Sequence, residues 1–290
     1  MSVTGSAARP IRLDAARLGL ARGRIEVWQT LTYWPDLLQA LFFSGLSIGV
    51  LVLMRGHHVP GTTFSLGSLT LPSVIGMNIA VGGVSGVAAL LVVDREDGTL
   101  LRAKATPNGM SAYVIGKITL TAATVLVGLV LTMVIGLLTF PGLDVTAAGW
   151  FTLVWVTALG LLATIPLGIL LGSLLPDPRF VGVIVLPFAG LAAISGIFYP
   201  ITHLPGWLQA IGQVFPIYWL GLGMRAALLP GYLRSVELDG SWRLGYVLLA
   251  LSGWAAVGLL AAPPVLRRMA QRESGSTVMA RRERAMLRRT

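Results

Sequence analysis

Long apolar segments alternate with short polar ones along the chain, and this pattern predicts helices that cross a membrane. About 20 apolar residues span the hydrocarbon core of a bilayer. Six segments reach or approach that length, at residues 37–54, 71–93, 113–140, 150–175, 181–198 and 245–266. Hydrophobic residues make up 55% of the 290-residue chain, which agrees with a polytopic membrane protein and argues against a soluble one. We therefore expect an all-α membrane protein with six transmembrane helices.

The polar segment before the first apolar run has its own periodicity. Its apolar residues recur every three or four positions, which places them on one helical face, while Arg12, Arg17 and Arg24 fall off that face. The pattern predicts an amphipathic helix lying in the membrane interface, with its arginines toward anionic head groups. A disordered basic tail is the alternative. The apolar positions are Ile11, Ala15, Leu18, Ala21, Ile25 and Trp28.

The distribution of positive charge sets the orientation. If the amino terminus is inside, 18 of the 22 Lys and Arg residues fall on the cytoplasmic side, the bias expected for cytoplasmic loops. We expect a multi-pass protein of the bacterial inner membrane with both termini in the cytoplasm. Its parts would be an amino-terminal segment (1–34), a membrane domain (35–266) and a basic cytoplasmic tail (267–290). The net charge of +10 is then explained by topology, and we expect no nucleic-acid partner.

Residues 94–107 separate the second and third apolar runs and carry six charges in 14 residues. Charges at the bilayer centre are costly, so this stretch is predicted to be a polar loop outside the hydrocarbon core. Asp97 or Thr99 could cap a short helix, and Pro107 would stop it. Gly98 allows a sharp turn from the membrane. A plain solvated connection is the alternative interpretation.

Residues 195–243 lie between the fifth and sixth apolar runs and contain several prolines, which break any continuous helix. Trp207 and Trp219 suit a membrane–water boundary. A short amphipathic helix over residues 207–214 is predicted to enter the outer leaflet without crossing it. We therefore expect re-entrant helices between spans five and six.

Both stretches resemble the permeases of type-2 ABC exporters. The first matches through Glu96-x-Gly98-Thr99-Leu100 and Thr106-Pro107, and the second through its prolines, tryptophan and arginine. The resemblance implies that the first stretch docks on a separate ATPase as a coupling helix, and that the second forms an exit gate. The implied coupling residues are Asp94, Arg95, Glu96, Gly98, Thr99, Leu100, Arg102, Lys104, Thr106 and Pro107. The implied gate residues are Tyr199, Pro200, Leu204, Pro205, Trp207, Pro216 and Arg225.

The chain offers no energy source of its own. A P-loop is missing, because Gly116-Lys117 is followed by Ile118 and lacks the first glycine of the motif. The centres of the predicted spans carry no ionisable residue, which disfavours a proton-driven carrier. No cysteine is present, and no catalytic or metal-binding arrangement is evident. We expect this chain to bind no cofactor, with ATP and Mg²⁺ on the partner subunit.

The resemblance implies two ATPase subunits and a second permease subunit, identical or paralogous, surrounded by membrane lipid. The implied cargo is hydrophobic or amphipathic: a drug, as in multidrug resistance, an antibiotic or a lipid. Export of a polysaccharide or glycolipid is an alternative, as is a scaffold or sensor that transports nothing. Residues that could line the substrate path are Phe42, Phe43, Asn78, Phe188 and Phe198.

Overall fold

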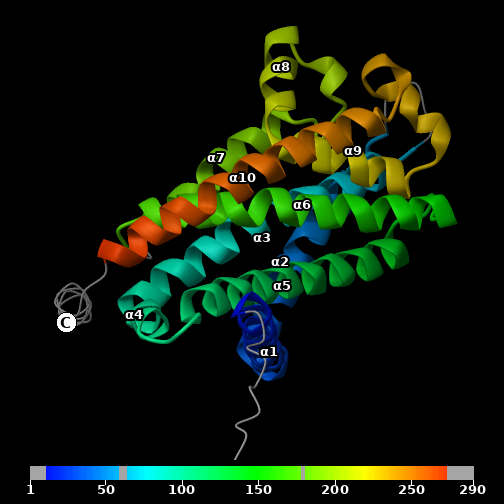
Figure 1. Ribbon diagram of the computed structural model, residues 1–290. Coiled ribbons are helices and arrows are strands. Elements are labelled where there is room, and N and C mark those ends of the chain that lie inside the picture. Colours follow the sequence, from blue (N-terminus) through cyan, green and yellow to red (C-terminus); the bar gives the residue numbers. More distant parts are fainter. Residues whose placement is uncertain (1–10, 59–63, 178–179, 273–290) are drawn as a thin grey trace, which may run out of the picture.

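The computed structural model describes residues 11–58, 64–177 and 180–272, and within these ranges the chain is helical, with only an isolated bridge between His58 and Ser65. The predicted all-α class is confirmed. The helices are α1 (Ile11–Thr32), α2 (Trp34–Leu53), η1 (Met54–Gly56), α3 (Leu66–Glu96), α4 (Thr99–Lys104), α5 (Gly109–Thr139), α6 (Ala147–Leu174), α7 (Val181–Ile194), η3 (Ile201–His203), α8 (Gly206–Val214), α9 (Pro216–Leu228), η4 (Gly231–Val236), η5 (Leu238–Gly240) and α10 (Leu244–Arg272). Figure 1 shows their arrangement.

Among the described residues, four helices are long and apolar enough to cross a membrane: α3, α5, α6 and α10. The two other predicted spans fall on α2 and α7, where the apolar helical stretches Ser44–Gly56 and Val181–Ile194 are shorter. Crossing by α2 and α7 therefore stays a prediction. The four long helices run roughly alongside one another through the bundle (Figure 1).

The ends of α7 and α10 differ from the predicted ends of the fifth and sixth apolar runs. The fifth apolar run was expected to remain helical to residue 198, but α7 ends at Ile194. Gly196 follows with a φ of 64°, a left-handed conformation that ends a helix and that glycine adopts without strain. At the other end, α10 continues past residue 266 to Arg272, so the start of the basic tail is helical. Residues 273–290, which carry five arginines of the predicted basic tail, lie outside the described ranges. Arg9 and Arg179 also lie outside them.

The core is built around α3, which packs against α2, α5, α6, α7 and α9. Helix α9 has 13 residues, of which 12 are buried. At 1.5 Å per residue its length is about 20 Å, too short to cross a hydrocarbon core of about 30 Å. A Cβ on Gly76 of α3 would lie 2.7 Å from the backbone nitrogen of Gly221 in α9. The two helices therefore touch backbone to backbone.

The small residues of α6 also allow a close helix contact. Gly168 and Gly172 face Val84 and Ala88 of α3, and a Cβ on Gly168 would lie 2.3 Å from the carbonyl oxygen of Val84. This is the packing expected of a Gly-x-x-x-Gly spacing in a membrane helix. On α2, by contrast, a Cβ on Gly45 or Gly49 would meet nothing within 4 Å.

Candidate functional site

The coupling segment, residues 94–107, covers the end of α3, the whole of α4 and the turn into α5. Asp94 and Glu96 belong to the last turn of α3, which continues beyond the predicted boundary at residue 93. Asp94 is buried, with a relative exposure of 9%, so the polar loop expected from its six charges does not begin there. Gly98, with a φ of 71°, separates α3 from α4.

The short helix predicted within this segment is present as α4. Its predicted cap is not: Gly98 is the N-cap residue, and no side-chain hydrogen bond caps the helix. Instead, the guanidinium of Arg102 reaches back along the helix. It donates one bond of 2.8 Å to the Thr99 hydroxyl and another of 3.3 Å to the carbonyl oxygen of Asp97. Arg102 therefore braces the first turn of α4.

One face of α4 is anchored and the other is exposed. Leu100 and Ala103 are buried in an apolar cluster with Tyr113 of α5 and Leu266 of α10. Arg102 and Lys104 lie on the exposed face. The segment thus presents charged side chains on a helix that is fixed to three membrane helices, at the end of the bundle opposite α9 (Figure 1).

The remaining predicted coupling residues surround this helix. Arg95 is half-buried and donates a 3.0 Å hydrogen bond to the carbonyl oxygen of Leu175, which ties the end of α3 to the end of α6. Thr106 donates a 3.0 Å bond to the carbonyl oxygen of Ala103. Pro107 is exposed in the turn that leads into α5. These contacts fix the position of α4 between its neighbours.

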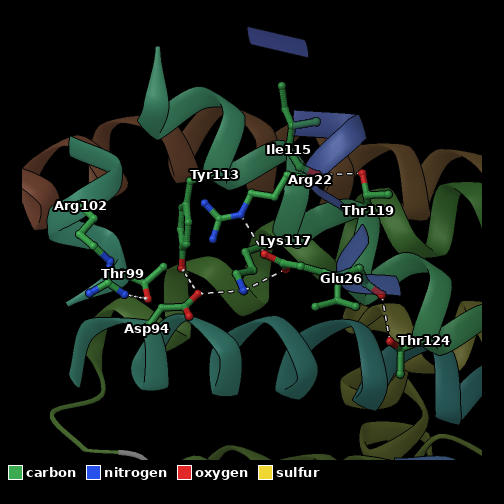
Figure 2. Close-up of polar contacts among 11 residues, drawn as sticks. Arg22, Glu26, Asp94, Thr99, Arg102, Tyr113, Ile115, Lys117, Thr119 and Thr124 are labelled. Carbon is green, nitrogen blue, oxygen red and sulfur yellow. Dashed lines mark hydrogen bonds and ion pairs between the residues drawn. The ribbon is translucent and has the colours of Figure 1, made fainter. Parts of the chain in front are cut away.

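A buried charge cluster lies beside α4 and consists of Arg22, Glu26, Asp94, Tyr113 and Lys117 (Figure 2). Asp94, Tyr113 and Lys117 are buried, and Arg22 and Glu26 at its α1 side are half-buried. The Lys117 ammonium lies 3.1 Å from a carboxylate oxygen of Asp94 and 3.1 Å from one of Glu26. The Tyr113 hydroxyl donates a 2.7 Å bond to Asp94. Arg22 donates a 2.8 Å bond to Glu26. The cluster connects α1, α3 and α5.

The charges of this cluster compensate one another, with two cations and two carboxylates in contact. Such balance is what permits ionised groups to be buried, because an unpaired charge in an apolar interior costs several kcal/mol. For Glu26 on α1, burial opposes ionisation, but the hydrogen bond from Arg22 and the charge of Lys117 outweigh it. Together they lower the pKa of the Glu26 carboxyl below its ordinary value. Glu26 is therefore ionised at neutral pH.

Two glycines bring α1 close enough to join the cluster. A Cβ on Gly19 would lie 2.7 Å from Cβ of Ile115, and one on Gly23 would lie 2.7 Å from Cβ of Thr119. The packed face of α1 thus carries small residues, whereas Leu18 and Trp28 of the predicted apolar stripe are 59% and 69% exposed. The sequence pattern did not predict the contact between Arg22 and Glu26. The Gly19-x-x-x-Gly23 spacing, and a lysine at the edge of an apolar run, were the signals available.

Arg225 occupies the centre of the exit segment, residues 195–243, and its guanidinium is buried. One nitrogen donates bonds of 2.7 Å to the Ser73 hydroxyl on α3 and 3.2 Å to the carbonyl oxygen of Gly196. Glu237 lies 2.7 Å away as its counter-ion, and both side chains are 3% exposed. Arg225 thus joins α9 to α3, to the end of α7 and to the loop before α10.

Glu237 was not singled out from the sequence. It lies in a polar stretch after α9, where a carboxylate is ordinary, and only the fold shows that it turns inward. Its partner Arg225 was predicted through the resemblance. A basic residue surrounded by apolar ones on α9 was the signal that a buried acid must lie nearby.

The short helix predicted in the exit segment is present as α8. Trp207 is 66% exposed at its start, while Gly212 packs against the carbonyl oxygen of Ile194. Tyr199 donates a hydrogen bond to the carbonyl oxygen of Ala193. Of the remaining predicted gate residues, Pro200 and Pro216 are buried, Leu204 is half-buried and Pro205 is exposed.

The residues predicted for a substrate path do not share one surface. Phe42 on α2 is 65% exposed, whereas Phe188 and Phe198 are half-buried and pack against the main core. Asn78 is half-buried on α3, and the side chain of Phe43 lies outside what the structure describes. A substrate path along these positions stays a prediction.

One family matches this sequence. It is described as ABC-2 family transporter protein, and it matches residues 55–262. The matched region includes both the coupling segment and the exit segment, and it excludes α1. No curated protein matches the chain.

Proposed function

The chain belongs to the ABC-2 transporter family, and from this premise we propose that it is the permease of an ATP-driven exporter. Family membership makes it a multi-pass membrane subunit of an ABC transporter and not itself the ATPase. ATP and Mg²⁺ would bind a partner subunit. The proposal extends to the direction of transport, the docking site and the cargo class.

The proposal is supported most directly by the two faces of α4, one exposed and one buried. A permease without an ATPase site needs a surface that receives force from outside the membrane and passes it inward. Helix α4 has an exposed face with Arg102 and Lys104, and its buried face packs on α5 and α10. The buried charge cluster lies beside it. We propose that two ATPase subunits dock on the α4 helices of two permease subunits.

Substituting Glu96→Lys, Arg102→Glu and Lys104→Glu together should abolish co-purification of the ATPase or uncouple transport from hydrolysis. These side chains border the proposed contact, where each exposed ion pair contributes roughly 0.2–1 kcal/mol. Reversal of three charges turns those contributions into repulsion. Pull-down of the ATPase and the ratio of transport to ATP hydrolysis in proteoliposomes would measure the effect.

Arg234→Glu is the matched control, because Arg234 is an exposed arginine in η4, beyond α9. It should leave both measurements unchanged. If the triple variant binds the ATPase and couples as well as Arg234→Glu does, the docking site is not α4.

A second permease subunit would meet this one through α2 and α7. Both helices carry glycines with open space around them, at positions 45, 49, 182 and 190. Leu46 and Leu186 on the same two helices are 55% and 71% exposed. Small residues beside large apolar ones favour close packing of membrane helices. We propose these faces as the seam between the two subunits.

For the exit segment we propose re-entrant helices that close the path on the outer side. The chain has no native cysteine, so single cysteines can report on α8. Leu208→Cys, at a half-buried position, should resist an impermeant thiol reagent at rest and react faster during ATP hydrolysis. Trp207→Cys, at a position that is 66% exposed, is the control and should react equally in both states. Equal rates of thiol modification at Leu208→Cys in all states would show that this segment is an ordinary surface loop and does not close the path.

The proposed cargo is a hydrophobic or amphipathic molecule such as a drug, antibiotic or lipid, exported across the bacterial plasma membrane with both termini inside. Export of a polysaccharide or glycolipid is the second candidate, and a scaffold that only recruits a partner is the third. Stimulation of ATP hydrolysis by the cargo in reconstituted complexes separates both exporters from the scaffold.

A further inference from the structure

A groove of about 470 Å³ lies between α5 and α10, with Pro166 and Ile169 of α6 at its back. It is separate from the exit segment and from the residues predicted for the substrate path. Its mouth lies beside the end of α4, where Lys104 contributes to the lining. Leu259, on its α10 side, is 49% exposed, so the groove opens on the flank of the molecule.

The lining changes from apolar to polar along the groove. Leu259 and Ile118 lie at one end, and Arg267 and Gln271 lie at the other. Leu259 and Gln271 are 12 positions apart on α10, a rise of about 18 Å at 1.5 Å per residue. Half of a hydrocarbon core of about 30 Å is about 15 Å. The groove therefore has the length and polarity of a single leaflet.

The polar end is cationic. Lys104 and Arg267 are both exposed there, Ser111 and Gln271 add neutral donors, and the described lining contains no carboxylate. Basic pockets between membrane helices bind the phosphate of anionic lipid head groups. We propose that the groove binds an anionic glycerophospholipid of the membrane, with its phosphate between Lys104 and Arg267 and an acyl chain along Ile118 and Leu259.

The carboxy-terminal residues of this chain are unsuited by charge to occupy the groove. Residues 273–290 follow α10 directly but carry five arginines against two glutamates, so the two cations of the groove would repel them. A phospholipid in the groove would contact α4 and α10 at once. It would thereby join the proposed docking helix to the last membrane helix. Lipid binding requires neither the ATPase nor the cargo, so its failure and a failure of the proposed transport function are distinguishable.

Lipid-titrated native mass spectrometry of the full chain in detergent would test the proposal, with dioleoyl phosphatidylglycerol as the probe. The variant Lys104→Gln/Arg267→Gln should weaken binding roughly 25-fold, since each cation near an anionic lipid contributes about fivefold. Dioleoyl phosphatidylcholine, whose choline group offsets the charge of its phosphate, should bind more weakly than the anionic lipid, and the double variant should reduce its binding less. Glycerol phosphate, which lacks acyl chains, should not compete.

Arg24→Gln/Arg268→Gln is the matched control, because it removes one exposed cation from α1 and one from α10 without touching the lining. It should retain wild-type affinity. Leu259→Trp, which fills the apolar end and leaves every charge in place, should also reduce binding. Equal phosphatidylglycerol affinity in wild type and Lys104→Gln/Arg267→Gln would overturn the proposal. So would equal affinity for the two lipids, or release of the bound molecule to the other side during ATP hydrolysis, which would identify it as cargo.

Discussion

Replacing Glu237 with glutamine should lower the free energy of unfolding by about 3–5 kcal/mol, the cost of breaking a buried ion pair from one side. Arg225 would keep its bonds to Ser73 and Gly196 but would lose its counter-ion at 2.7 Å. Only 3% of either side chain is exposed, so water cannot replace the lost partner. Titration with SDS in mixed micelles, followed by circular dichroism, would measure the change.

Asp239→Asn provides the control for this prediction, because Asp239 is an acid two residues away whose side chain is 78% exposed. It should unfold like the wild type. The double variant Arg225→Met/Glu237→Leu should recover most of the lost stability, since an apolar pair of similar volume often replaces a buried ion pair without cost. A glutamine variant as stable as Asp239→Asn would show that the pair contributes little.

Replacing Lys117 with methionine should have the second large effect, again a loss of about 3–5 kcal/mol in unfolding free energy. Lys117 is the one residue of the buried charge cluster that touches both Asp94 and Glu26. Without it, two carboxylates would remain in a partly buried site, and the link between α1 and α3 would be lost. Faster amide hydrogen exchange throughout α1 should accompany the loss of stability.

Arg24→Met removes an exposed cation from α1 itself and should change neither stability nor exchange. The variant Glu26→Gln/Asp94→Asn/Lys117→Gln keeps hydrogen-bonding groups without charges, and it should be more stable than Lys117→Met. Unaltered exchange in α1 after Lys117→Met would mean that the glycine contacts alone hold this helix.

Hydropathy was sufficient to place the long helices, because a run of apolar residues in a membrane protein has few alternatives to helix. Glycine and proline residues, which mark the ends of short helices, located α4 and α8. The early end of α7 could not be predicted, since Gly196 terminates the helix inside an apolar run. Whether a glycine adopts a left-handed φ depends on the chain that follows it.

The charged contacts were harder to foresee than the helices. Lys117 and Glu26 are 91 residues apart, and their meeting depends on the close approach of α1 to α5. Periodicity identified the apolar stripe on α1 but not the face used for packing, because Gly19 and Gly23 contribute no hydrophobic signal. For the same reason, the pattern did not show that Arg22 turns toward Glu26.

Helix α3 carries one end of each buried ion network, with Ser73 beside Arg225 and Asp94 beside Lys117. These two residues are 21 positions apart, about 31 Å along the axis, and no proline lies between them. The helix therefore connects the two ion networks as one continuous rod. A tilt of about 5° at the Asp94 end moves the Ser73 end by about 3 Å, enough to break a hydrogen bond. A small rotation at α4, passed along α3, would thus strain the bond between Ser73 and Arg225 without any break in the helix between the two networks.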